Sequence, residues 1–288
     1  MFFAKKALAI AAFCVPLGLA QAQERVIFPS VDADLKSGVA SNLYGYLYKP
    51  KGAGPFPAVV VMHGCTGLMQ GDSVHPLYGA WGERLSSRGF VALLPDSMGS
   101  RGHGDLCAYQ PANERPVQPG REMPRDAYGA LAYLRTLPDV QANNVAIFAQ
   151  SFGAIATMFA IASDAAPRGT TSDFKAAVLL YPACAVFLKR EPKWAPRMST
   201  LLLMGEDDNW TPAAPCKELF GRLEGGPVAV ESHYYKGAYH AFDNPITLAR
   251  VLEAVKLPDG TSPTAGAHPE SRDDSVVRVS KYLAEKLK

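Results

Sequence analysis

A serine in a strand–turn–helix pattern is the first residue of this chain that predicts chemistry. The apolar run at residues 145–149 leads into the sequence QSFG around Ser151, and an apolar helical run follows. Such a turn holds a serine hydroxyl above a sheet as a nucleophile when small residues two positions before and after it let strand and helix approach closely. Ala149 and Gly153 are these small residues, with Ala149 standing where glycine is usual. The alternative for Ser151 is an ordinary helix N-cap.

An acid and a histidine follow this serine in the order of one type of catalytic triad. Asp208 comes just after the apolar run at residues 201–204, and His240 follows the last predicted strand. The order serine, acid, histidine is that of the α/β-hydrolases and differs from the chymotrypsin-like and subtilisin-like orders. In such a triad the histidine takes the serine proton and the acid holds the histidine tautomer. Asp207 stays open as an alternative acid.

A histidine–glycine loop after an early strand supplies groups that could stabilise a developing negative charge. The apolar run at residues 58–62 ends in the sequence HGCTG, which begins at His63. In this kind of site one backbone N–H comes from that loop and another from the residue after the nucleophile. We assign these oxyanion donors to Cys65 and Phe152, and a loop-shaping role to His63. One such donor typically lowers the barrier by ~3 kcal/mol.

Three further residues are candidates for the substrate pocket. Trp210 lies next to the predicted acid, and Tyr239 lies next to the predicted base. Arg101 belongs to the sequence SRGHG and would hold an anionic substrate group through a bidentate contact. The alternatives are simple packing for the two aromatic residues and an ion pair within the loop for Arg101.

Short apolar runs alternate with helix-length segments, which predicts an α/β fold with a mainly parallel sheet. The predicted strands are residues 43–48, 58–62, 91–94, 145–149, 176–181, 201–204 and 228–234. The predicted helices are residues 77–87, 125–137, 152–163, 215–223 and 274–288. Two long segments, residues 97–123 and 257–274, are predicted to be loops. Neither separates two cores, so we predict one catalytic domain over residues 23–288.

The first 22 residues have the pattern of a secretory signal peptide. Lys5 and Lys6 precede an apolar stretch at residues 7–19, and the sequence AQA before Gln23 has small residues where signal peptidase reads them. We therefore predict cleavage before Gln23, a periplasmic or secreted protein, and no stable membrane anchor after cleavage. Retention of the segment as an N-terminal anchor is the alternative.

The composition predicts a folded protein that does not bind nucleic acid. Of its 288 residues, 48% are hydrophobic and 19% are charged, which excludes disorder as the dominant state. The formal net charge of +2 falls to zero when the signal segment, with its two lysines and no acid, is removed. No basic block is long enough to follow a phosphate backbone. We therefore expect no nucleic-acid partner, and the predicted triad implies a small-molecule substrate.

Six landmarks of the sequence resemble the dienelactone hydrolase family of α/β-hydrolases. They are VVVMHGCTG, RGFVALLPDS, RDAYGALAYL, AQSFG, LLLMGEDDNWTP and YHAFD. The resemblance covers most of the chain after the signal segment. It implies an eight-stranded, mostly parallel sheet with helices on both faces, and neither a metal nor another cofactor.

One departure from the family pattern concerns the substrate. The namesake enzymes use a cysteine nucleophile to open a dienelactone, whereas this chain has Ser151. The serine favours hydrolysis of carboxylic esters, with lactones as a further class. Two alternatives stay open: a serine peptidase of the same fold, and a secreted binding protein on a hydrolase scaffold that has lost catalysis.

Four cysteines remain after the signal segment, an even number for an exported protein. They are Cys65, Cys107, Cys184 and Cys216, which allow three pairings in two disulfides. In the sheet order that the resemblance implies, the strands before Cys65 and Cys107 are neighbours, and so are those before Cys184 and Cys216. Proximity therefore favours the pairs Cys65–Cys107 and Cys184–Cys216.

Two alternatives to a disulfide at Cys65 are open. A metal site would combine Cys65 and Cys107 with His63 and His75, but these spacings match no compact zinc pattern. A free thiol buried behind the oxyanion loop is the second alternative. We expect no metal site.

Overall fold

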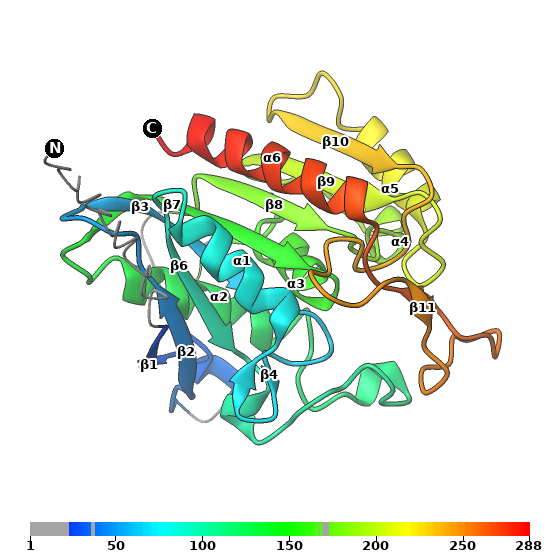
Figure 1. The fold of residues 1–288 in the computed structure, drawn as a ribbon, viewed down its shortest axis with the longest axis horizontal. Helices are drawn as coiled ribbons and strands as arrows, with labels where there is room; N and C mark the ends of the chain where they lie inside the picture. Colours follow the sequence, from blue (N-terminus) through cyan, green and yellow to red (C-terminus); the bar gives the residue numbers. More distant parts are fainter. Residues whose placement is uncertain (1–22, 36–37, 167, 169–172) are drawn as a thin grey trace, which may run out of the picture.

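An eight-stranded sheet forms the centre of the protein (Figure 1). The structure is a computed structural model that describes residues 23–35, 38–166, 168 and 173–288. The predicted signal peptide, residues 1–22, lies outside them. The strand order is β1-β2-β6-β3-β7-β8-β9-β10. The pairs β1–β2 and β2–β6 are antiparallel and the other pairs are parallel, which confirms the predicted, mostly parallel α/β-hydrolase sheet.

Seven of these strands overlap the predicted ones. The strands are β1 (Glu24–Pro29), β2 (Asn42–Tyr48), β3 (Phe56–Met62), β6 (Val91–Asp96), β7 (Val140–Gln150), β8 (Ala176–Leu180), β9 (Ser199–Gly205) and β10 (Val230–Tyr235). The sequence patterns missed β1, an edge strand in which only Val26 and Phe28 are buried. Two further pairs of short strands lie outside the sheet: β4 (Met69–Gln70) with β5 (Ser73–Val74), and β11 (Arg250–Val251) with β12 (Thr264–Ala265).

Helices cover both faces of the sheet. They are α1 (Pro76–Ser86), α2 (Glu122–Leu134), α3 (Phe152–Ala160), α4 (Ala185–Leu188), α5 (Ala213–Gly221) and α6 (Pro269–Lys286). In Figure 1, α1 and the red helix α6 lie in front of the sheet, and α2 and α3 lie behind it. Helix α6 begins earlier than predicted, at Pro269, because a proline in the first helical turn needs no intrahelical N–H partner.

The central strands are buried on both faces, which explains their apolar runs without alternation. Every residue from Ala58 to Met62 and from Ala176 to Leu180 has an exposed fraction of 0%. Burying one such valine or leucine side chain contributes roughly 1.5–3 kcal/mol. Met62 pairs with Ala149 across β3 and β7, so the loops that carry His63 and Ser151 leave the sheet side by side.

Two disulfides join loops at this edge of the sheet. They link Cys65 to Cys107 and Cys184 to Cys216, the predicted pairing. The Cys65–Cys107 disulfide therefore uses both cysteines of the alternative metal site. In the described ranges, no group of three or more His, Cys, Asp or Glu side chains could hold a metal ion. Within the same ranges, no helix is both long and apolar enough to cross a membrane.

Candidate active site

Ser151 lies at a sharp turn between β7 and α3. Its backbone has a φ of 52° and a ψ of −117°, a conformation that residues other than glycine rarely adopt. Gly153 permits the turn, because a Cβ there would lie only 2.5 Å from the carbonyl oxygen of His63. Ser151 occupies the N-cap position of α3, but its side chain makes no capping hydrogen bond. The hydroxyl is therefore directed elsewhere.

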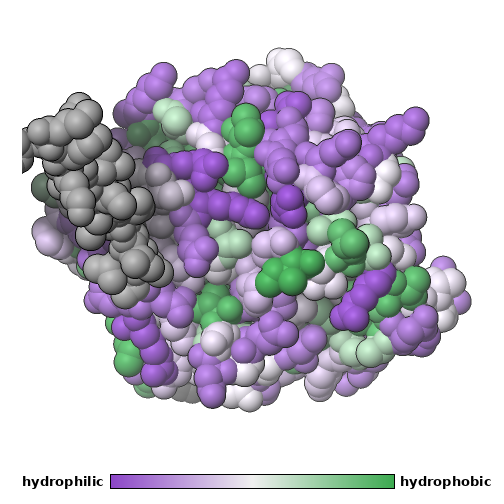
Figure 2. Space-filling model, in the orientation of Figure 1, coloured by the Kyte–Doolittle hydropathy of each residue, from purple (hydrophilic) through white to green (hydrophobic). Residues whose placement is uncertain are grey.

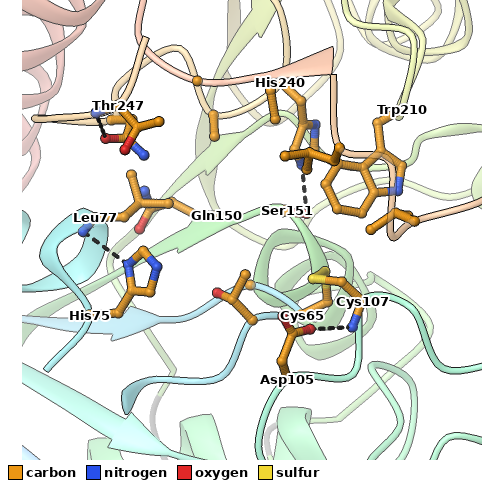
Figure 3. A pocket seen from close by; sticks show the side chains of 18 of the residues that line it. Cys65, His75, Leu77, Asp105, Cys107, Gln150, Ser151, Trp210, His240 and Thr247 are labelled. Atoms are coloured by element: carbon orange, nitrogen blue, oxygen red, sulfur yellow. Dashed lines mark hydrogen bonds between the residues drawn. A yellow bond between two sulfur atoms is a disulfide. The ribbon is translucent and has the colours of Figure 1, made fainter. Parts of the chain in front are cut away.

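A chain of hydrogen bonds joins Ser151, His240 and Asp208. Ser151 Oγ lies 2.9 Å from His240 Nε2, the contact drawn as a dashed line in Figure 3. His240 Nδ1 lies 2.7 Å from Asp208 Oδ2. His240 is 3% exposed and Asp208 is 4% exposed, so little water competes for these contacts. With its proton on Nδ1, the imidazole donates to Asp208 and leaves Nε2 to accept the serine proton.

The loop after β9 fixes the Asp208 carboxylate. Asp208 Oδ1 accepts hydrogen bonds from the backbone N–H groups of Trp210 and Thr211, at 2.9 and 2.8 Å. Thr211 Oγ1 lies 2.9 Å from Asp208 Oδ2 and 3.0 Å from His240 Nδ1. Asp207, the alternative acid, is exposed and contacts the Ala238 carbonyl through its own N–H. The structure therefore places Asp208, and not Asp207, beside the imidazole.

Sequence reasoning missed Thr211, although a signal for it exists. An aspartate whose side chain accepts from the N–H groups two and three positions later forms a common local turn. Asp208 and Thr211 have this spacing. A threonine three residues after a candidate acid is therefore a residue to test for a positioning role.

His63 shapes the oxyanion loop, which we define as residues 63–67. Its Nδ1 donates to the Gly64 carbonyl at 2.8 Å, and its Nε2 accepts the Ser97 N–H at 3.1 Å. Burial lowers the pKa of His63, in keeping with a neutral ring that donates at one nitrogen and accepts at the other. Because the peptide unit is planar and trans, fixing the Gly64 carbonyl also fixes the direction of the Cys65 N–H.

Two backbone N–H groups beside Ser151 are free to bind a ligand. Among the described residues, neither the Cys65 N–H nor the Phe152 N–H has a protein acceptor. The oxyanion loop packs directly on the turn, since a Cβ at Gly64 would lie 3.4 Å from Ser151 Cβ. The Gly64 N–H is held by the hydroxyl of Tyr78, at 2.9 Å. These contacts hold the loop directly beside the turn that carries Ser151 and Phe152.

Two aromatic rings pack against His240. The Trp210 ring centroid lies 4.9 Å from the imidazole centroid, and the Tyr181 ring meets it edge-on at 4.6 Å. Trp210 and Tyr181 both line the cavity above Ser151, whereas Tyr239 is not among its lining residues. Of the two aromatic pocket candidates from the sequence, only Trp210 faces the site.

A second carboxyl group, Asp243, lies three residues after His240. It accepts hydrogen bonds from Trp81 Nε1 at 2.6 Å, Gln150 Nε2 at 2.7 Å and the Tyr181 hydroxyl at 2.7 Å. Asp243 has no exposed surface, and burial raises its pKa. These bonds tie α1, the end of β7 and the end of β8 to the loop that carries His240. No sequence motif indicated this cluster.

The predicted pocket role of Arg101 needs correction. Its side chain is 7% exposed and lies between two carboxylates, with Nη2 at 2.8 Å from both Asp32 Oδ2 and Asp126 Oδ1. Nη1 donates to the Ser97 carbonyl at 2.8 Å. Arg101 does not line the cavity, and both terminal nitrogens of its guanidinium are already hydrogen-bonded. It holds the loop after β6 against the N-terminal part of the chain.

The cavity above Ser151 has a volume of about 730 Å³. Figure 3 shows Trp210 and the Cys65–Cys107 disulfide on one side of Ser151, and His75, Leu77 and Thr247 on the other. This volume lies within the usual range for small-molecule sites. A small-molecule substrate at Ser151 therefore has space.

Comparison with known proteins adds the family to this geometry. The sequence model of the dienelactone hydrolase family matches residues 43–284. The chain belongs to this family. A search of curated proteins finds no match to it. Membership makes the protein a hydrolase of the dienelactone hydrolase family, with serine at the sharp turn after β7.

Solved structures share the fold of this dienelactone hydrolase family member. A dienelactone hydrolase-like promiscuous phosphotriesterase, P91 from metagenomic libraries, is 19% identical with a TM-score of 0.67, covering 93% of this chain and 100% of its own. Propionate-bound esterase 2 of Thermogutta terrifontis is 16% identical with a TM-score of 0.58, covering 90% and 93%. Dipeptidyl peptidase 4 of Porphyromonas gingivalis is 16% identical with a TM-score of 0.61, covering 93% of this chain but 36% of its own.

Proposed function

We propose that this protein is a serine hydrolase that cleaves carboxylic esters, with lactones as a further substrate class. Ser151 is the nucleophile, His240 the general base and Asp208 the acid that holds the base. The observation that carries the proposal is the hydrogen-bond chain from Ser151 Oγ to His240 Nε2 at 2.9 Å and from His240 Nδ1 to Asp208 at 2.7 Å. Membership in a hydrolase family supports it.

In the first step, Ser151 Oγ attacks the ester carbonyl carbon while His240 Nε2 takes its proton. Asp208 keeps the other imidazole proton on Nδ1 and stabilises the positive charge that forms on the ring. The Cys65 and Phe152 N–H groups donate to the oxygen that becomes negative. Because His63 and Tyr78 already fix the loop, little reorganisation is needed as this charge develops.

In the second step, His240 gives its proton to the departing alkoxide, and the acyl group stays on Ser151. Water then attacks the acyl carbonyl while His240 Nε2 takes the proton of the water molecule. Collapse of this intermediate releases the carboxylic acid and returns the proton to Ser151. The same two donors stabilise both oxyanions.

A panel of p-nitrophenyl esters and lactones tests the proposal. Ser151→Ala should reduce ester turnover by at least ~10³, the usual scale for loss of a triad nucleophile. Ser86→Ala, which removes a buried hydroxyl that bonds within α1, is the matched control and should retain activity. Full activity in Ser151→Ala would contradict the assignment of the nucleophile.

The same panel separates the two alternative functions. Faster Ser151-dependent cleavage of peptide p-nitroanilides than of esters would favour a peptidase. No turnover of any ester, lactone or peptide by the folded wild type would favour a binding protein.

We also propose that the enzyme is exported and that residues 1–22 are removed in the course of export. Two disulfides support an oxidising compartment. Expression of the full chain in a Gram-negative host should give a periplasmic protein whose N-terminal residue is Gln23. A cytoplasmic protein that retains Met1 would contradict export.

A further inference from the structure

A segment after His240, residues 244–255, forms one wall of the cavity. Ile246 and Val251 line the cavity and are still 71% and 50% exposed, and Leu248 between them is 67% exposed. Three of the nine large hydrophobic residues that are exposed in the described ranges thus fall within six positions. Figure 2 shows such apolar side chains as green areas on a mostly hydrophilic surface. Exposed apolar residues grouped at the mouth of a cavity mark a binding surface.

Backbone hydrogen bonds fix this wall relative to His240. The Gly266 N–H donates to the His240 carbonyl at 2.8 Å, and the Ala267 N–H donates to the Thr247 carbonyl at 2.7 Å. Gly266 has a φ of 138°, and a Cβ there would lie 2.5 Å from the Leu248 carbonyl oxygen. Only glycine allows this approach, so the fold sets the distance from the apolar wall to the imidazole.

A second hollow adjoins the cavity at Ile246. This hollow of about 410 Å³ shares Pro76 and Ile246 with the first, and Val74 and Tyr48 line its far part. The first hollow thus lies between Ser151 and Ile246, and the second lies between Ile246 and Val74. The beginning of α1 and the segment of residues 244–255 contribute to both hollows.

The charges around the cavity do not favour an anionic substrate. The Asp, Glu and Arg residues that line the two hollows are Arg250, Asp105, Glu253 and Glu83, one cation and three carboxylates. Arg101, the other candidate for an anionic group, is held between Asp32 and Asp126 outside the cavity. A site for a carboxylate-bearing substrate would concentrate positive charge instead.

Building on the proposed ester hydrolysis, we propose that the substrates are neutral esters with a long apolar chain. The apolar chain of the ester lies in the groove that runs from Ser151 past Ile246 toward Val74. We call this groove the chain groove. Each methylene that the groove buries can raise kcat/KM by up to about fourfold. An acetyl or ethyl group would leave most of the groove empty.

Two ester series test this substrate class and show which arm of the ester occupies the groove. p-Nitrophenyl esters from acetate to octanoate lengthen the acyl arm, and alkyl acetates from ethyl to octyl lengthen the alcohol arm. We expect kcat/KM to rise at least tenfold between the shortest and the longest member of one series. The series that rises identifies the arm. A flat or falling profile in both series would overturn the proposal.

Protein variants test where the apolar chain of the ester binds. The double variant Ile246→Ser with Val251→Ser should lower the ratio of kcat/KM for the longest to the shortest ester at least fivefold. Val277→Ser on α6, at a residue 64% exposed and far along the chain from the groove, is the matched control and should leave that ratio unchanged. An unchanged ratio in the double variant would overturn the chain groove.

These outcomes separate the two proposals. If esters are cleaved only when Ser151 is present but short esters are best, the proposed function stands and the chain groove fails. If no ester is cleaved in a Ser151-dependent way, both fail.

Discussion

Asp208 and Asp243 are both buried carboxyl groups near His240, and they differ in what they bind. Asp208 contacts the imidazole and accepts two backbone N–H groups of its own loop. Asp243 accepts three side-chain donors, one each from α1, from β7 and from the residue that follows β8. The first carboxyl group is placed to act on the base, whereas the second holds together the elements around it.

The two carboxyl groups also differ in how far along the sequence their hydrogen-bond donors lie. The backbone donors to Asp208 lie two and three residues away. The donors to Asp243 lie 162, 93 and 62 residues away. A short turn thus orients the proposed acid, and tertiary packing alone assembles the second cluster. We therefore expect loss of Asp208 to affect mainly catalysis and loss of Asp243 to affect mainly stability.

Asp208→Asn should have the largest effect on turnover. The asparagine amide cannot stabilise the imidazolium and favours the wrong imidazole tautomer, so kcat for a p-nitrophenyl ester should fall by roughly 10³–10⁴. The midpoint of thermal unfolding should change little. Asp207→Asn, at the exposed neighbouring position, is the control and should retain most activity. An equal loss of kcat in Asp208→Asn and Asp207→Asn would contradict the assignment of Asp208 as the acid of the triad.

Asp243→Asn should have the larger effect on stability. An amide nitrogen in place of one carboxyl oxygen leaves a buried donor without its acceptor, which costs about 1–3 kcal/mol. We expect the free energy of unfolding in urea to fall by that amount, while kcat falls less than tenfold. A kcat loss as large as that of Asp208→Asn, in a variant that is still folded, would show that Asp243 acts on the chemistry.

The stability difference between wild type and Asp243→Asn should depend on pH. Burial raises the pKa of Asp243 above its ordinary value of 3.8, so the folded state binds this proton more tightly than the unfolded state. Its contribution to stability is complete below pH 3.8 and is lost as the pH rises through the folded pKa. Urea unfolding of both proteins at pH 4 and pH 7 should give the larger difference at pH 4. A larger difference at pH 7 would contradict the raised pKa.

Tyr181→Phe should have the smallest effect. The variant loses the hydroxyl that bonds to Asp243 but keeps the ring that meets His240 edge-on. We expect a stability loss of about 1 kcal/mol and a change in kcat of less than about threefold, measured on the same ester. Tyr44→Phe on the exposed side of β2 is the control. A thousandfold loss of kcat would mean that the hydroxyl takes part in the reaction.

The sequence predicted well the positions of residues that lie at the ends of strands. Ser151, Asp208 and His240 each follow a strand of the parallel part of the sheet, and the carboxyl ends of parallel strands meet at one edge of a sheet. They lie together there in the structure, while their catalytic role stays a prediction. The cysteine pairing was predicted from the order of strands that the family resemblance implies, since the cysteines alone allow three pairings.

What the sequence missed depends on contacts between distant segments. Arg101 has the residue type of an anion-binding group, but Asp32 and Asp126 already occupy its guanidinium. Neither carboxylate has a spacing from Arg101 that indicates a contact. The apolar wall at Ile246 was also hidden, because it lies in a segment with no predicted helix or strand, where apolar residues have no periodicity to mark them.

Covalent labelling tests the central claim, that Ser151 is the nucleophile, most directly. A fluorophosphonate reacts with a serine only when a base activates it, and intact-protein mass spectrometry counts the adducts. We predict one adduct per chain, located by peptide mapping on Ser151, with loss of ester hydrolysis in proportion to labelling. His240→Ala should abolish the label while the protein stays folded. An adduct at another residue, or full hydrolysis by a protein labelled completely at Ser151, would contradict the account.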